Sequence, residues 1–89
     1  MPTVTFTDNI QRLVSLPPMQ VRGKTVKQAL DQVFKKHANA RSYVLDEHGA
    51  VRYHVVIFVN GRSIKDRETL SDKVPPDADV YVMQALSGG

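Results

Sequence analysis

Residues 25–38, TVKQALDQVFKKHA, carry the strongest structural signal in the chain. Apolar residues recur there at spacings of three and four, which is the pattern of a helix that buries one stripe. They are Val26, Ala29, Leu30, Val33, Phe34 and Ala38. Thr25 precedes Gln28 by three positions, a spacing typical of the capping box at a helix start. The stretch therefore predicts one main helix, from about residue 26 to residue 38, that packs on one face of a sheet.

Upstream of this helix the sequence predicts a hairpin. Residues 3–7, TVTFT, alternate polar and apolar side chains, as in a strand that turns Val4 and Phe6 inward. A second, short strand is expected over residues 19–22. The intervening residues 10–16 fit either a helical turn or a continuation of the sheet edge.

Downstream of the helix the sequence predicts a second hairpin. Residues 43–45 are expected to form a short strand that ends in a turn at residues 46–49. Residues 55–59, VVIFV, are typical of a strand covered on both faces. Asn60-Gly61 favours a tight type I′ turn, because both residues tolerate positive φ. Residues 62–64 should then fold back as the partner strand.

The last predicted strand covers residues 80–84, VYVMQ, and follows a turn at residues 75–78. Two strands, one main helix and further strands make an α+β layout with a mixed sheet. With 89 residues, 42% of them hydrophobic, the chain can build a single core. We therefore expect one domain over residues 1–86 and a flexible tail over residues 87–89.

Composition argues against several classes of function. The net charge of +3 arises from 12 basic and 9 acidic residues spread along the chain, without the basic block typical of nucleic-acid binding. The absence of cysteine excludes disulfides and a nucleophilic thiol on this chain, and it suits a reducing cytoplasm. No segment approaches the roughly 20 apolar residues that cross a bilayer. We expect a cytoplasmic protein that binds neither nucleic acid nor membrane.

The final residues, Ser87-Gly88-Gly89, follow the last predicted strand directly. Glycine lacks the Cβ atom that would block a narrow channel, and it accepts nearly any backbone conformation. Three extended residues reach roughly 10 Å. The tail could therefore carry the carboxylate of Gly89 into the active site of another protein.

Four motifs, VNGRSI, PPDAD, VYVMQAL and the final SGG, together resemble the ubiquitin-like sulfur-carrier family. Relatives in this family are the small subunit of molybdopterin synthase, the thiamine sulfur carrier and the carrier for protein-bound cysteine synthesis. The resemblance implies a β-grasp fold. Residues 9–18 and the long 39–52 connection favour the cysteine-type branch. Gln84 is a departure, because relatives often have proline near this position.

The resemblance also implies the chemistry. A ubiquitin-activating-like adenylyltransferase would use ATP and Mg²⁺ to adenylate Gly89, and a persulfide sulfur donor would displace AMP to give a thiocarboxylate. A biosynthetic enzyme would then accept the sulfur for cysteine, a cofactor or another thio-metabolite. Gly88 and Gly89 are required by sterics, so no residue of this chain is expected to be catalytic, and no cofactor is expected to bind to it.

Partner recognition is expected on the sheet. If Val80 and Val82 face the helix, alternation turns Tyr81, Met83 and Ala85 to the opposite face, where Val56 and Phe58 could join them. The expected docking residues are Phe58, Tyr81, Met83, Ala85 and Leu86. Packing of these side chains against the 39–52 connection is the alternative. A further set, Arg62, Lys65 and Arg67, is expected to form a solvated basic rim or to steer an acidic partner.

Other functions have weaker support in the sequence. His37, His48 and His54 match no ligand spacing for a metal. Asp46 and Glu47 lie in a predicted turn without a remote carboxylate to complete an acid/base pair. The main alternative to a sulfur carrier is a ubiquitin-like modifier that joins Gly89 to lysines of target proteins. A third possibility is an interaction domain with an inert tail.

Overall fold

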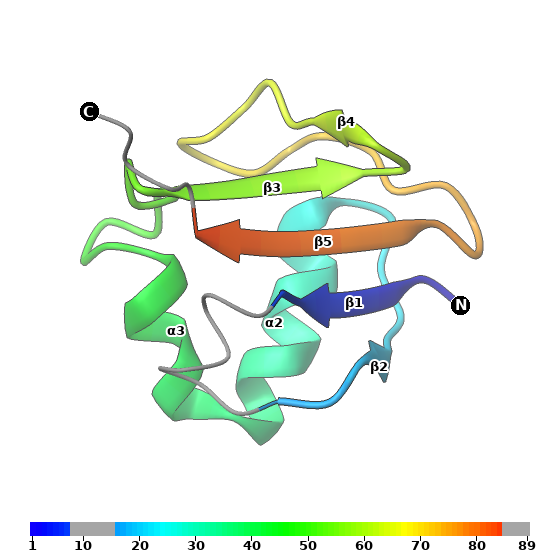
Figure 1. Ribbon diagram of the computed structural model, residues 1–89, viewed down its shortest axis with the longest axis horizontal. Coiled ribbons are helices and arrows are strands. Elements are labelled where there is room, and N and C mark those ends of the chain that lie inside the picture. The colour runs from blue at the N-terminus through cyan, green and yellow to red at the C-terminus, as the bar shows by residue number, and fades with distance from the viewer. Residues whose placement is uncertain (8–15, 85–89) are drawn as a thin grey trace.

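The computed structural model describes residues 1–7 and 16–84, which form one five-stranded sheet and two helices (Figure 1). The strands are β1 (Thr3–Phe6), β2 (Met19–Gln20), β3 (Val55–Val59), β4 (Arg62–Ser63) and β5 (Asp79–Gln84). The helices are α2 (Val26–Lys36) and α3 (Ala38–Val44). The strand order is β2-β1-β5-β3-β4. The segment 8–15, which includes most of the ambiguous stretch, and the tail 85–89 lie outside the described residues.

The sheet is mixed, as expected from the sequence. β1 and β5 pair in parallel at its centre, and the other neighbours pair antiparallel. The central register sets Val4 opposite Val80 and Phe6 opposite Val82. All four side chains are buried, and they pack with Leu30 of α2 in one hydrophobic core. The predicted inward face of the first strand is therefore confirmed.

The start of α2 explains why the helix begins where the sequence predicts. The Thr25 hydroxyl accepts a hydrogen bond from the Gln28 amide at 3.2 Å, and the Gln28 side chain accepts one from the Lys24 amide at 2.8 Å. The amides of Val26 and Lys27 donate at 3.0 Å to carbonyls of the 70–72 segment. The free amides of the first turn thus find partners in a local cap and in a distant loop.

The connection after α2 differs from the prediction. The helix ends at Lys36 instead of Ala38, and residues 38–44 form a second helix where a strand was expected over residues 43–45. Ala38 is exposed, whereas Ala40 and Val44, which are four residues apart, are buried. The predicted strand was wrong because burial at helical spacing outweighs the β propensity of a short Tyr-Val pair.

The strands that follow confirm the predicted turns and correct one detail. Asn60 and Gly61 both have positive φ, 50° and 84°, and they connect β3 to β4 as expected. Burial alternates along β3, so Val55 and Ile57 are buried and Val56 is half-buried. The prediction of a strand covered on both faces is confirmed for one face only, because Val56 and Phe58 on the second face are half-buried.

Residues 66–71 form a turn organised by one carboxylate. Asp66 accepts hydrogen bonds from the side-chain hydroxyls of Ser71 and Thr69 and from the amide of Thr69 at 2.9 Å. These bonds favour the charged form and hold the pKa of Asp66 well below its usual range. The hydrogen bonds that stabilise the 66–71 turn therefore favour the ionised form of the Asp66 carboxylate.

In the variant Asp66→Asn, the free energy of unfolding is expected to depend less on pH in the acid range. The pKa of Asp66 is lower in the folded than in the unfolded chain, so its stabilisation is present above the unfolded value of about 4 and is lost as pH falls through the folded value. The variant should therefore be less stable than the parent at pH 7, and the difference should shrink below about pH 4. Urea unfolding at pH 7 and pH 3 measures it, and an equal difference at both values would contradict the prediction.

Candidate functional site

The outward face of β5 is the first part of the candidate site. Val80 and Val82 are fully buried on the helix side, whereas Tyr81 is 40% exposed and Met83 is half-buried. The predicted alternation along the last strand is therefore confirmed. The strand separates a core face from a face that a partner can reach.

Sheet register gathers the predicted docking residues from two strands. Phe58 lies opposite Tyr81, and Val56 lies opposite Met83. Directly opposed residues of neighbouring strands have adjacent side chains on the same face. We call these four residues the open-face patch. The alternative expectation was packing of these side chains against the 39–52 connection. Val56, Phe58 and Met83 are half-buried, whereas Tyr81 is 40% exposed.

The remaining predicted site residues follow β5. Gln84, the last residue of the strand, lies opposite Val55. Ala85 and Leu86, predicted for docking, and Ser87, Gly88 and Gly89, predicted for threading and reaction, lie outside the described residues. The register thus identifies the end of the sheet from which the tail continues, and we call it the exit end.

A tight turn at the exit end was missed by the sequence reasoning. The amide of Val55 donates to the carbonyl of Arg52 at 2.9 Å, which closes a turn over residues 52–55. Tyr53 in this turn is 93% exposed, and its ring centroid lies 5.5 Å from that of His54 in an edge-to-face arrangement. The feature of the sequence that could have indicated this turn is an aromatic residue between two polar ones, Arg52 and His54, immediately before the apolar strand.

Arg67 supports the 52–55 turn through two hydrogen bonds. Its guanidinium donates hydrogen bonds to the carbonyls of Arg52, at 2.7 Å, and Val55, at 2.6 Å. Arg67 is half-buried, whereas Arg62 and Lys65 are exposed. The predicted basic rim therefore needs a correction, because hydrogen bonding to buried backbone makes Arg67 a structural residue.

The three histidines lie in different parts of the fold, and one of them, His48, has its Nε2 atom 3.7 Å from the carboxylate of Glu47. His37 separates the two helices, His48 lies in an exposed turn and His54 contacts Tyr53. Across residues 1–7 and 16–84, no three side chains of the His, Cys, Asp or Glu types come together as a metal site would require. The Asp46 carboxylate accepts hydrogen bonds from the amides of His48 and Ala50 at 2.8 and 3.1 Å, and these lower its pKa.

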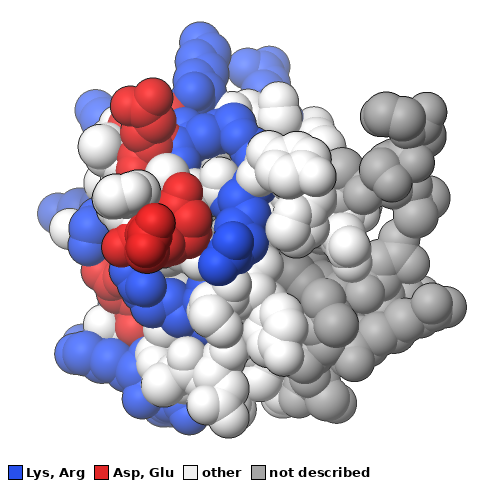
Figure 2. All heavy atoms as spheres, turned by 90° about the vertical axis from the view of Figure 1, so that its left-hand side faces the viewer, with Lys and Arg blue, Asp and Glu red and all other residues white. Residues whose placement is uncertain are grey.

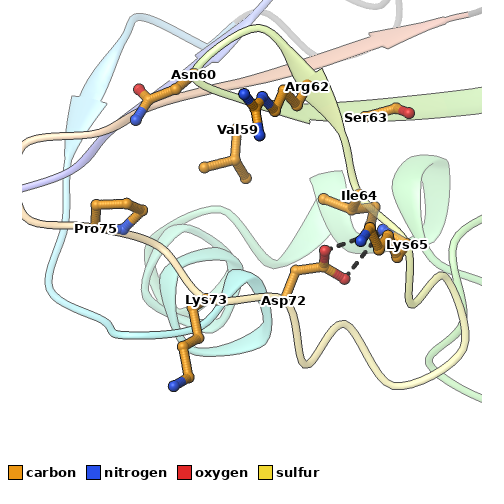
Figure 3. Close-up of a pocket in the computed structure, with 9 residues that line it drawn as sticks. All are labelled: Val59, Asn60, Arg62, Ser63, Ile64, Lys65, Asp72, Lys73 and Pro75. Carbon is orange, nitrogen blue, oxygen red and sulfur yellow. Dashed lines mark hydrogen bonds between the residues drawn. The ribbon is translucent and has the colours of Figure 1, made fainter.

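A cavity of about 480 Å³ lies far from the exit end, beside the Asn60-Gly61 turn. Figure 3 shows its lining, which comes from the β3–β4 hairpin and from residues 72–75. The Asp72 carboxylate accepts hydrogen bonds from the backbone amide of Lys65, at 3.0 and 3.1 Å (Figure 3). This acidic group holds the loop, so it offers no free acid or base to the cavity.

Charge is mixed on the side of the molecule where β5 ends. Figure 2 shows basic and acidic side chains interspersed over one part of this side, next to a broad uncharged area. Within the described part of the chain, no helix is long and apolar enough to cross a membrane. Both charged and uncharged surface is thus present on the side where β5 ends (Figure 2).

The comparisons with known proteins identify the fold. No known family profile and no curated protein sequence matches the chain. Among solved structures, SAMP1 from Haloferax volcanii is 20% identical with a TM-score of 0.77, covering 99% of this chain and 98% of its own. CysO in the Amycolatopsis orientalis BexX/CysO complex is 19% identical with a TM-score of 0.82, covering 100% of both chains. CysO from Mycobacterium tuberculosis is 15% identical with a TM-score of 0.80, covering 97% of this chain and 100% of its own.

These likenesses show that the chain has the ubiquitin-like β-grasp fold. The α+β fold class expected from the sequence is confirmed, with two helices in place of one main helix. The resemblance to the ubiquitin-like sulfur-carrier family is confirmed for the fold.

Proposed function

We propose that this protein is a sulfur carrier whose Gly89 carboxylate is adenylated and then converted to a thiocarboxylate. The observation that carries the proposal is the arrangement along β5. This strand presents Tyr81 and Met83 on its open face and ends at Gln84, from which only residues 85–89 lead to the glycine carboxylate. A partner that docks on the strand can therefore receive the reactive group that follows it.

The proposed reaction proceeds in steps that partner proteins catalyse. The Gly89 carboxylate attacks the α-phosphate of ATP, and pyrophosphate leaves. The terminal sulfur of a persulfide attacks the acyl-adenylate, and AMP leaves with its bonding electrons. A thiol then attacks the resulting acyl disulfide, forms a new disulfide with the donor sulfur and releases the thiocarboxylate. ATP and Mg²⁺ belong to the adenylyltransferase in this scheme, which favours a cytoplasmic location.

This chain would contribute shape and contact instead of acid or base groups. Gly88 and Gly89 leave the carbonyl open to attack, because neither carries a Cβ atom. Ser87 would thread with them into the partner. The open-face patch, together with Ala85 and Leu86, would bind the activating enzyme and later the biosynthetic enzyme that accepts the sulfur. Apolar and aromatic residues are common at the centre of such interfaces.

Mass analysis of C-terminal fragments tests the proposal. The protein is incubated with a candidate adenylyltransferase, ATP, Mg²⁺ and a sulfur source, and the fragment containing Gly89 is isolated. The expected result is replacement of one oxygen by sulfur in that fragment, only when ATP is present. Fragmentation is necessary because oxidation of Met1, Met19 or Met83 changes the mass of the whole chain by nearly the same amount. A shift that persists without ATP, or none with any of several activating enzymes, would reject the proposal.

A ubiquitin-like modifier is the second candidate, and one comparison favours it. The small archaeal modifier protein 1 of Methanosarcina acetivorans is 17% identical with a TM-score of 0.79, covering 99% of this chain and 95% of its own. A modifier would use the same adenylate but pass Gly89 to a lysine amine. Target lysines joined by an isopeptide bond to the C-terminal peptide that ends in Gly89 would support this function, and free thiocarboxylate would support the carrier.

A further inference from the structure

Tyr53 is exposed in a way that the core does not explain. Among the large apolar side chains of residues 1–7 and 16–84, it is the most exposed, at 93%, compared with 40% for Tyr43 and Tyr81. An aromatic ring in water gains none of the free energy that burial of its apolar surface would give. Burial in the core therefore does not account for the position of this ring.

The turn that carries Tyr53 is firmly supported. The Arg67 guanidinium bonds the carbonyls at both ends of the turn, those of Arg52 and Val55. Hydrogen bonds with a charged donor are stronger than neutral ones. The side chain of Arg52 donates in turn to the carbonyl of Ser42 in α3, at 2.7 Å. A residue held on such a support loses less conformational entropy when it binds than one on a loose loop.

The turn also lies where the proposed tail begins. Val55 pairs with Gln84, and neighbouring strands are about 4.8 Å apart, so Tyr53 and the end of β5 share one end of the sheet. The five residues from Ala85 to Gly89 span at most about 18 Å when fully extended. Any partner that holds Gly89 in its active site must therefore have its surface within that distance of Gln84.

We propose that Tyr53 is a recognition residue for the adenylyltransferase and that its ring enters an apolar recess beside the channel for the tail. This assignment rests on the proposed function. It adds to the open-face patch a second contact, which lies at the exit end of the sheet and not on its face. Arg52 and His54, its neighbours in the chain, are half-buried, so the ring of Tyr53 is the most exposed side chain of the 52–55 turn. Tyrosine combines a large apolar body with a hydroxyl, and it is enriched at protein interfaces.

The test measures ATP–pyrophosphate exchange with the adenylyltransferase that supports the sulfur exchange at Gly89, with the full-length carrier protein as varied substrate. For Tyr53→Ser we expect the KM for the carrier to rise about tenfold while kcat stays within about twofold, because a binding anchor remote from the reacting atoms acts on association. Tyr53→Phe keeps the ring and should keep the KM within about threefold of the parent.

Pro76→Ala is the matched control, because Pro76 is exposed in the turn before β5, at the opposite end of the strand. Its KM should equal that of the parent. The ring of Tyr53 is almost fully exposed, so its truncation should leave the circular dichroism and the unfolding curve unchanged. A KM for Tyr53→Ser equal to that of the parent would overturn the assignment while leaving the proposed function intact. Absence of exchange with the parent chain would instead reject the proposed function and this assignment together.

Discussion

Deletion of Gly88 and Gly89 should abolish ATP-dependent sulfur incorporation and leave the free energy of unfolding within about 0.5 kcal/mol of the parent. Incorporation is lost because the reacting carboxylate would then lie on Ser87, which has a Cβ atom beside the carbonyl and a shorter reach from Gln84. Stability is kept because the fully buried residues of the last strand, Val80 and Val82, are untouched. C-terminal fragment mass analysis and urea unfolding measure the two quantities on the same preparation.

Single substitutions in the tail separate the effect of chain length from the effect of a side chain next to the reacting carbonyl. Gly89→Ala keeps the length of the chain and adds one methyl group next to the attacked carbonyl. We expect the initial rate of adenylation to fall about 100-fold, as for a reacting group displaced by about 1 Å. Ser87→Ala keeps both glycines and should stay within about threefold of the parent. Sulfur incorporation that survives the double deletion would show that Gly89 is not the acceptor.

Gly23→Ala should lower the free energy of unfolding by about 2 to 4 kcal/mol, the sum of forced overpacking and an unfavourable backbone conformation. A Cβ atom at Gly23 would lie 2.7 Å from the amide nitrogen of Ala29 and 3.0 Å from the carbonyl carbon of Gln28. Both are backbone atoms of the first turn of α2, so no side-chain rotation can relieve the contact. The φ of Gly23 is +158°. Urea unfolding monitored by circular dichroism measures the loss.

Gly61→Ala is the matched control for this steric effect. Gly61 also has positive φ, 84°, but a Cβ atom there would meet no atom within 4 Å. Its cost should be about 1 kcal/mol, from backbone conformation alone. Equal losses in the two variants would show that the close approach of Gly23 to α2 does not limit stability.

Local chemistry made several parts of the fold predictable. The Thr25 hydroxyl and the Gln28 side chain mark the start of α2, because they supply partners to amides within four residues. Asn60-Gly61 marks its turn because both residues adopt positive φ. Alternation along residues 80–83 separates the core face from the open face, since successive side chains of a strand point to opposite sides.

The candidate site was predicted only in part, because its residues come from distant segments. Alternation placed Tyr81 and Met83 on the open face, but the pairing of Phe58 with Tyr81 depends on the β3–β5 register. The role of Arg67 could not be read from its neighbours in sequence. Its partners are the carbonyls of Arg52 and Val55, which are 15 and 12 residues away.

The class of fold, the main helix, the β3–β4 turn and the glycine ending could all be predicted, because each depends on residues close together in the chain. Three features became visible only in the folded chain: residues 38–44 form a helix, Arg67 supports the 52–55 turn, and Tyr53 lies at the same end of the sheet as Gln84. Periodicity reports which side of an element is apolar. Two features cannot be inferred from such local patterns, because they form only when distant segments meet. These are the burial of Ala40 and Val44 and the pairing of Val55 with Gln84.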